Sequence, residues 1–298
     1  MKKKLCAAVL ALSLACPSFH AQNLVNETPE QKDKRMEWFH KAKLGIFIHW
    51  GIYAVKGVSE SWSFYNKYLP HDEYLKQCEG FTASKYDPKA WVELIKESGA
   101  QYTVLTTKHH DGVALWDTKQ NGISVVKNTP AKRDLVTPFV NEVRKAGLRL
   151  GLYYSLPDWS HPDYPNMTRT DVRYKDDPKR WDNFCKFNFG QLAELNNTYK
   201  PDLYWFDGDW EMSAETWRAK EIMQLLRSNN KNVIVNSRIT GYGDYATPEQ
   251  GVPVVRPEDK YWELCMTMND SWGYQHNDKN YKTPHMLLRT FVDCLSNG

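Results

Sequence analysis

Short runs of consecutive apolar residues recur along the chain, separated by longer stretches with helical periodicity. Runs without polar alternation are typical of strands that are buried on both faces, as in a parallel sheet. The pattern predicts strands of this kind at residues 44–48, 102–106, 148–153, 203–206 and 232–235, with a sixth at 261–268.

The stretches between these runs predict helices. Asp87 followed by Pro88 is a helix start signal, and a glycine closes the segment that they open. Within it, Trp91, Leu94 and Ile95 are expected to share the buried face. Further helices are expected at residues 137–147, 180–195, 214–227 and 284–295. Strands that alternate with helices, without an internal repeat or a linker, predict one α/β domain with a parallel sheet.

Polar and aromatic residues gather at the C-terminal end of each predicted strand, at 49–51, 108–112, 153–155, 207–210, 236–238 and 262–263. In a (β/α)8 barrel these ends converge on one mouth, where such enzymes do their chemistry. An open sheet collects ligands at one crevice only. The chain has no glycine-rich phosphate loop, which argues against a nucleotide site. We therefore predict a (β/α)8-like barrel of the TIM type, with residues 22–298 as the catalytic domain.

The N-terminus has the pattern of a secretory signal. Three lysines precede an apolar run at residues 5–16, which is too short to span a bilayer. Cleavage after Ala21 would remove a signal peptide of residues 1–21 and leave an exported, periplasmic protein. Cleavage before Cys16 would instead leave a lipoprotein anchored through that cysteine. No later run is long enough for a transmembrane segment.

The composition is that of an ordinary globular protein, with 41% hydrophobic and 25% charged residues among 298. The formal charge of +3 includes the three signal lysines, so the mature chain is near neutral and has no excess of positive charge that would attract nucleic acid. Twelve Trp and seventeen Tyr, many beside Gly, Asp or His, suit the C–H faces of sugars. The remaining cysteines are too widely spaced for a zinc ribbon or a redox pair. The oligomeric state is left open.

Three carboxylates are candidates for catalysis. Retaining glycoside hydrolysis needs two carboxyl groups about 5 Å apart, a nucleophile and an acid that later acts as a base. Asp207 ends an apolar strand and precedes a glycine, so its carboxylate would be accessible at the strand end. The structural alternative to a catalytic role is that Asp207 caps a helix or forms a salt bridge. Glu249 and Glu263 are candidates for the acid. Apolar neighbours would raise the pKa of Glu263 toward the range of a general acid, unless it pairs with an arginine.

Three histidines, His49, His109 and His110, lie at the ends of two predicted strands. They could bind a metal, but no His-x-His pair accompanies them, and the candidate nucleophile would have to serve as a ligand. As neutral imidazoles they could instead donate to and accept from sugar hydroxyls, beside rings such as Trp62 and Trp205. We expect no metal and no other cofactor.

Five motifs follow one another in the chain. They are Ile-His-Trp-Gly at 48–51, Thr-Lys-His-His-Asp-Gly at 107–112, Gly-Leu-Tyr-Tyr-Ser at 151–155, Asp-Leu-Tyr-Trp-Phe-Asp-Gly at 202–208, and Trp-Glu-Leu-Cys at 262–265 leading to Ser-Trp-Gly-Tyr at 271–274. In this order they resemble the α-L-fucosidases of glycoside hydrolase family 29, over residues 36–298. The resemblance implies a retaining exo-glycosidase that removes terminal L-fucose from oligosaccharides or glycoproteins, without a metal, on a barrel followed by a C-terminal β-domain.

The resemblance also assigns roles to individual residues. Asp207 falls on the family nucleophile. Family members place the acid/base at different points, so Glu263 matches one group and Glu249 another, with Glu263 as the first choice. At 59–62 the chain has Ser-Glu-Ser-Trp where many relatives have adjacent Glu and Trp as sugar contacts, so Trp62 carries over and the role of Glu60 is left open. Positions around the fucose are matched by His49, Trp62, His109, His110, Tyr154, Trp205 and Arg238.

The chain ends earlier than such relatives do. The final predicted helix has an apolar face of Met286, Leu287, Phe291 and Val292, and no predicted strand follows it. We therefore expect a barrel without its last strand and without the β-domain, which leaves open edges. A catalytically inactive remnant or a fucose-binding module is the alternative function.

Overall fold

The computed structural model describes residues 27–297. The predicted signal peptide and the lipoprotein site at Cys16 lie outside this range. Within it, no helix combines the length and the apolar character needed to cross a bilayer.

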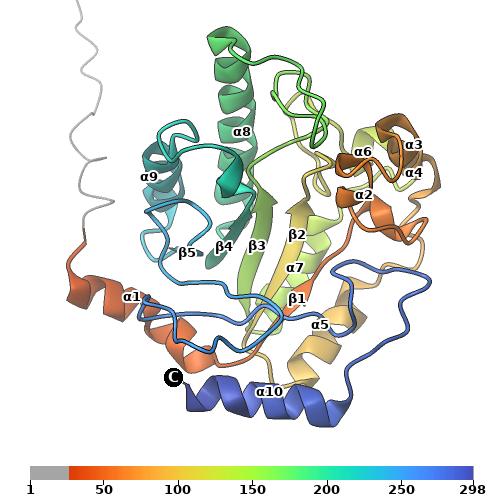
Figure 1. The fold of residues 1–298 in the computed structure, drawn as a ribbon. Coiled ribbons are helices and arrows are strands. Elements are labelled where there is room, and N and C mark those ends of the chain that lie inside the picture. Colours follow the sequence, from red (N-terminus) through yellow and green to blue (C-terminus); the bar gives the residue numbers. More distant parts are fainter. Residues whose placement is uncertain (1–26, 298) are drawn as a thin grey trace, which may run out of the picture.

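One parallel sheet organises the described residues (Figure 1). Its strands pair in sequence order, so the order never reverses as it does in doubly wound sheets. Neighbouring residues include Leu105 beside Leu152 and Tyr153 beside Trp205. The five strand predictions are confirmed to within two residues at each end: β1 Gly45–Ile48, β2 Tyr102–Lys108, β3 Arg149–Ser155, β4 Leu203–Asp207 and β5 Ile234–Val235.

The predicted sixth strand is not formed. Residues 261–268 meet the chain at 246–249 only through the isolated bridges Ala246 to Trp262 and Glu249 to Cys265. Pro248 lies between these bridges, and a proline cannot donate a ladder hydrogen bond. Within residues 27–297 the sheet is therefore open at β1 and β5. These five strands do not by themselves form the predicted barrel.

Helices follow the strands as the periodicity predicts. The predicted helices correspond to α5 Pro88–Glu97, α7 Val136–Lys145, α8 Pro178–Tyr199, α9 Ala219–Asn229 and α10 Pro284–Ser296. The structure adds α1 Pro29–Ala42 before the sheet and the short helices η2 Ile52–Ala54, α2 Trp62–Tyr65, α3 His71–Leu75, α4 Gln77–Gly80, α6 Val125–Asn128 and η3 Asp209–Glu211.

Two predicted helix faces need correction. In α5 the buried residues are Val92 and Ile95, whereas Leu94 is 69% exposed. At 3.6 residues per turn Leu94 lies far round the helix from Val92, so both cannot face the sheet. In α10 no residue is buried, and Met286 and Val292 of the predicted apolar face are exposed.

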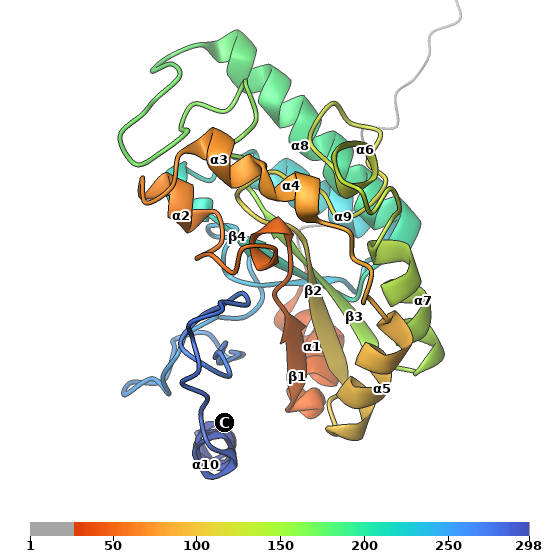
Figure 2. The ribbon, with the colours of Figure 1, turned by 90° about the vertical axis from the view of Figure 1, so that its right-hand side faces the viewer.

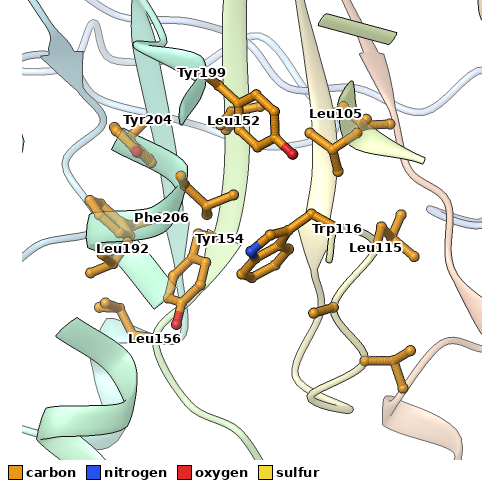
Figure 3. Packing of buried hydrophobic residues seen from close by; sticks show 14 of the residues in the cluster. Leu105, Leu115, Trp116, Leu152, Tyr154, Leu156, Leu192, Tyr199, Tyr204 and Phe206 are labelled. Atoms are coloured by element: carbon orange, nitrogen blue, oxygen red, sulfur yellow. The ribbon is translucent and has the colours of Figure 1, made fainter. Parts of the chain in front are cut away.

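The two faces of the sheet have different coverings. One face packs against α5, α7, α8 and α9, and its side chains, including Leu105, Leu152, Tyr154, Tyr204 and Phe206, form the main core (Figure 3). Because side chains alternate along a strand, the other face carries Val104, Tyr153, Leu203 and Trp205. Phe39 of α1 and Tyr245 pack on this second face, which leads to the site described below.

The chain after β5 covers the second face without regular strands. In Figure 2 this segment, in blue, lies on the side of the sheet away from α5 and α7 and ends in α10. Its residues Tyr261, Cys265 and Trp272 belong to the same apolar cluster as Tyr153 and Trp205. The segment therefore closes one side of the space at the strand ends.

Candidate active site

A pocket of about 250 Å³ lies at the C-terminal ends of β1 to β4. The prediction that the strand ends converge on one mouth is confirmed for these four strands. The pocket is lined by Phe47, His49, Trp62, His109, Tyr153, Trp205, Asp207, Trp210, Arg238, Glu249, Cys265, Met266, Thr267, Met268, Asn269, Ser271 and Trp272. Its wall thus combines aromatic rings with a small set of polar groups, as ligand pockets do.

Asp207 ends β4 and reaches the pocket with its carboxylate held by three donors. Tyr153 donates its hydroxyl to Oδ2 at 2.8 Å, Arg238 donates Nη1 to Oδ1 at 2.7 Å, and the Gly208 backbone N–H lies 3.1 Å from Oδ1. Gly208 has a φ of 85°, and a Cβ there would lie 2.2 Å from Cδ of Pro157. Only glycine fits this turn, which leads the chain away and leaves the carboxylate open to the pocket.

Arg238 joins two carboxylates of the pocket. Its Nη1 contacts Asp207, and its Nη2 contacts Glu249. The guanidinium also lies over the Trp205 ring, with its carbon 4.6 Å from the ring centroid, and its Nε donates to Thr247 Oγ1 at 3.1 Å. One planar cation that binds both carboxylates holds them near each other and fixes their orientation.

Glu249 and Glu263 occupy different environments. Glu249 lines the pocket, and its side chain is 35% exposed. Glu263 does not line it; its oxygens accept from Trp205 Nε1 at 2.9 Å and from Tyr102 OH at 2.6 Å. Burial raises the pKa of Glu263, as the sequence predicted, although these hydrogen bonds oppose the shift. The structure thus places the second choice for the acid, rather than the first, at the pocket surface.

The three histidines surround Asp207 in a neutral state. Burial lowers the pKa of His49 to about 3 and that of His109 well below its usual value, so both imidazoles are uncharged at neutral pH. Each is oriented by a hydroxyl: Tyr53 lies 2.7 Å from Nδ1 of His49, and Ser61 lies 2.5 Å from Nδ1 of His109. Both line the pocket, where an uncharged imidazole can donate or accept a hydrogen bond.

His110 lies behind the pocket wall and is fully buried. Its Nδ1 is 2.6 Å from Ser155 Oγ, and its Nε2 is 3.5 Å from Asp207 Oδ2. Burial lowers the pKa of His110, and the nearby Asp207 opposes that shift. The structure therefore brings this residue to the candidate nucleophile, not to the pocket surface.

His109, His110 and Asp207 could in principle hold a metal ion, since one ligand atom of each lies within 4.8 Å of the others. Two imidazoles and a carboxylate suit several divalent metals. The same carboxylate, however, already accepts from the Arg238 guanidinium and the Tyr153 hydroxyl. A metal would have to bind beside that fixed positive charge, which disfavours it.

Aromatic rings form the apolar part of the pocket. Trp62 begins α2 and is stacked with Trp210, with centroids 6.4 Å apart and ring planes 15° from parallel. Trp205 and Tyr153 come from adjacent strands, and their rings are also stacked. Trp210 is 55% exposed, so part of its ring faces the solvent at the mouth.

The prediction for Tyr154 is wrong. Tyr154 is fully buried on the helix-covered face, where its hydroxyl lies 2.5 Å from Asn188 Oδ1 and 2.8 Å from Gln191 Oε1 (Figure 3). Lys108 reaches the same hydroxyl at 3.0 Å. Its neighbour Tyr153 faces the pocket instead, because consecutive residues of a strand point to opposite faces.

This pair of tyrosines gives a direct prediction. Tyr153→Phe should lower kcat/KM roughly 10- to 100-fold, since a hydrogen bond to a charged group contributes about 1.5–3 kcal/mol. Tyr154→Phe should leave KM unchanged and lower the melting temperature, because three buried polar groups lose a partner. Kinetics and thermal melts of both variants check this. Equal kinetic losses in the two would contradict the assigned faces.

Several pocket residues were not predicted from the sequence. Tyr153 lies in the strand-end cluster at 153–155, but nothing in the sequence distinguishes it from Tyr154. Phe47 carries no signal beyond an aromatic ring in a strand. Met266 and Met268 come from residues 261–268, which had been expected to form a strand, and Trp272 comes from the irregular stretch that follows them. Ser61, which orients His109, lies beside Trp62, so the 59–62 motif was the available signal.

Comparisons with known proteins show the family of this chain. A family model described as alpha-L-fucosidase matches residues 12–298. Tissue alpha-L-fucosidase of Mus musculus is 34% identical over 269 residues, which cover 80% of this chain and 57% of that protein. The alpha-L-fucosidase of Branchiostoma floridae is 33% identical over 294 residues, which cover 88% and 63%. The chain thus spans little more than half the length of these curated relatives.

Solved structures show the same similarity. Alpha-L-fucosidase isoenzyme 1 from Paenibacillus thiaminolyticus superimposes with a TM-score of 0.83 at 37% identity, over 89% of this chain and 68% of that one. Alpha-L-fucosidase AlfC from Lactobacillus casei, in complex with its α-L-fucose product, gives a TM-score of 0.77 at 30% identity, over 89% and 88%. With a family model that matches nearly all of its length, the chain belongs to the alpha-L-fucosidase family.

Proposed function

We propose that this protein is a retaining exo-glycosidase that hydrolyses terminal α-L-fucose from glycans or glycoconjugates. The observation that carries the proposal is the pair of pocket carboxylates, Asp207 and Glu249, bound to the one guanidinium of Arg238. Two carboxyl groups held close together across a sugar-sized pocket are the requirement of the retaining mechanism. AlfC, a member of the same family, has been solved with α-L-fucose in place.

In the first step, Asp207 attacks the anomeric carbon while Glu249 gives its proton to the leaving glycosidic oxygen. In the second step, Glu249 takes a proton from water, and the resulting hydroxide displaces Asp207 from the sugar. The two inversions together retain the anomeric configuration. The proton lost in the first step returns in the second, so the enzyme ends in its starting state.

Arg238 supports the change in the role of Glu249 between the steps. In the free site the guanidinium is shared between Asp207 and Glu249. Once Asp207 is esterified it has lost its charge, and the guanidinium then interacts mainly with Glu249. This contact holds the Glu249 side chain in place for the second step, in which Glu249 acts as the base.

The remaining pocket residues suit a deoxy sugar. Neutral His49 and His109 can bond hydroxyl groups without drawing the proton from the acid. Trp62 and Trp205 offer ring faces to C–H groups and to the methyl group of fucose. We assign fucosylated oligosaccharides or glycoproteins as the substrates and an exported, periplasmic protein as the form that meets them.

We also propose that the sheet is the first part of a (β/α)8-like barrel. The proposal is supported by the sequential strand order and by helices that follow the strands onto one face. In such a barrel the inner face would carry Tyr153, Trp205 and Asp207, and the pocket that they line would lie at the mouth.

Hydrolysis of an aryl fucoside tests the proposed function. Purified protein should release nitrophenolate from 4-nitrophenyl α-L-fucopyranoside, and EDTA should not reduce the rate, since neither step uses a metal. A thermal melt in parallel shows that the sample is folded. A cooperative melt without turnover would favour a fucose-binding module. If EDTA abolished the activity and zinc restored it, His109, His110 and Asp207 would be assigned as metal ligands instead.

A further inference from the structure

One side of the pocket is built by a single irregular segment. Residues 265–273, which we call the wall segment, supply Cys265, Met266, Thr267, Met268, Asn269, Ser271 and Trp272 to the pocket lining. None of them belongs to a helix or a strand. Because no sheet ladder fixes this wall, its position over the bound sugar must depend on individual contacts.

Many of the wall contacts stay within the C-terminal part of the chain. Thr267 Oγ1 donates to Gln250 Oε1 at 3.1 Å, and Ser271 Oγ donates to Asp278 Oδ2 at 2.6 Å. Lys282 donates to the carbonyl of Asn269 at 2.6 Å. Contacts of this kind give the segment its shape but do not fix it against the sheet.

Two buried glutamates connect the segment to the strands and to the loops near them. Glu263, just before the wall, accepts from Tyr102 and Trp205 of β2 and β4. At the far end, Glu60 accepts the backbone N–H of Gly273 at 2.5 Å, across 213 residues of sequence. Glu60 is only 2% exposed and does not line the pocket.

Gly273 fits this contact because it lacks a side chain. A Cβ at this position would lie 2.7 Å from Cε2 of Tyr53 and 3.0 Å from Oε1 of Glu60. A Cβ at Gly51 would lie 2.5 Å from Cε1 of the same tyrosine, so the ring is held between two glycines. The hydroxyl of Tyr53 is 2.7 Å from Nδ1 of His49. The far end of the wall therefore packs on the residue that orients a pocket histidine.

The conformation of Glu60 also indicates a specific role. Its φ of 30° is uncommon for a residue other than glycine, and such conformations persist where surrounding contacts hold them. Burial raises the pKa of Glu60 to about 7, so the site keeps a carboxyl group despite the cost of desolvating it. An apolar residue would fill the space but would leave the Gly273 N–H without this acceptor.

We propose that Glu60 is a positioning residue that fixes the wall segment over the sugar pocket through Gly273 and, through Tyr53, sets the orientation of His49. The proposal rests on the proposed function in that the pocket is taken to bind a sugar. Glu60 itself touches neither the pocket nor the reacting groups, so removing it should weaken binding more than it slows the chemical steps.

Amide hydrogen exchange tests the position of the wall without any turnover. In Glu60→Ala, amides of residues 265–273 should exchange roughly 10-fold faster or more, since a hydrogen bond to a buried carboxyl group is lost. Amides of β3 and β4 should keep their rates. Glu60→Gln retains an acceptor oxygen and should restore much of the protection. The matched control is Glu73→Ala, which removes an exposed partner of Lys76 and should change neither region.

Kinetics with 4-nitrophenyl α-L-fucopyranoside provide the second readout. Glu60→Ala should raise KM several-fold with a smaller change in kcat, and Gly273→Ala should do the same with Glu60 intact, because its Cβ displaces Tyr53. If Glu60→Ala does not fold, Glu60→Gln and Gly273→Ala still report on the wall. Unchanged exchange at 265–273 in all the folded variants would overturn the proposal. Faster exchange in a protein that never hydrolyses the fucoside would overturn the proposed function alone.

Discussion

Replacing Asp207 by Asn should abolish hydrolysis while the protein still folds. The amide keeps the shape of the side chain and can still accept from Tyr153 or Arg238, but it cannot form the glycosyl ester. Loss of an essential catalytic group lowers kcat by roughly 10⁴-fold or more. The rate on 4-nitrophenyl α-L-fucopyranoside and the melting temperature together measure this effect.

Asp209 provides the matched control. It lies two residues further on, at the start of η3, and accepts from Thr240 Oγ1 at 3.0 Å outside the pocket lining. Asp209→Asn should therefore retain most of the activity. If Asp209→Asn lost activity to the same degree and Asp207→Asn did not, the assignment of the nucleophile would be wrong.

The second large effect is expected at Glu249. Glu249→Ala should lower the rate on a natural fucosylated glycan by about 10²- to 10⁴-fold, because its alcohol leaving group needs a proton. The 2,4-dinitrophenolate of a 2,4-dinitrophenyl fucoside leaves without that proton, so formation of the fucosyl-enzyme should be nearly unchanged. Its hydrolysis should then limit the rate. Azide needs no base and should rescue this variant, with a fucosyl azide of retained configuration as the product.

Glu263→Ala is the comparison that decides between the two glutamates. Glu263 is bonded to Tyr102 and Trp205 behind the pocket, so its loss should lower the melting temperature and loosen the wall segment. Azide should not rescue its activity. Rescue of Glu263→Ala without rescue of Glu249→Ala would return the acid/base role to Glu263, which the family resemblance placed first.

Strands that are buried on both faces could be predicted well from the sequence. Continuous apolar runs mark β1 to β5 because both faces of these strands pack against other elements. The run at 261–268 has similar composition but lies beside a segment containing Pro248, where no ladder forms. The apolar composition of a segment indicates that it is buried. Whether the segment forms a strand also depends on the neighbouring segment with which it would pair, and its own composition says nothing about that neighbour.

The residues of the site could be predicted where they end a strand and carry polar chemistry. Asp207, His49 and His109 fall in this class, and all three line the pocket. Tyr153 and Tyr154 could not be told apart, because a shift of one residue moves a side chain to the other face and both are aromatic. The choice depends on the pairing of Tyr153 with Trp205, which is a property of the folded sheet.

The role of Glu60 lay beyond sequence analysis for a different reason. Its partner is a backbone N–H of a residue 213 positions away, and any residue except proline supplies such a donor. Glu263 was detectable as a buried carboxylate, but whether it faces the pocket or lies behind it depends on the path of the wall segment. Contacts between distant irregular segments leave little local signal.

Trapping of the covalent intermediate tests directly whether Asp207 is the nucleophile of a retaining mechanism. The protein is incubated with a fluorinated fucosyl substrate whose glycosyl ester breaks down slowly, digested, and examined by mass spectrometry. We expect one added fluorofucosyl group, carried by the peptide that contains Asp207 and absent from the Asp207→Asn variant. A label on Asp209 or Glu249, or an active enzyme that accumulates no label and releases fucose of inverted configuration, would contradict it.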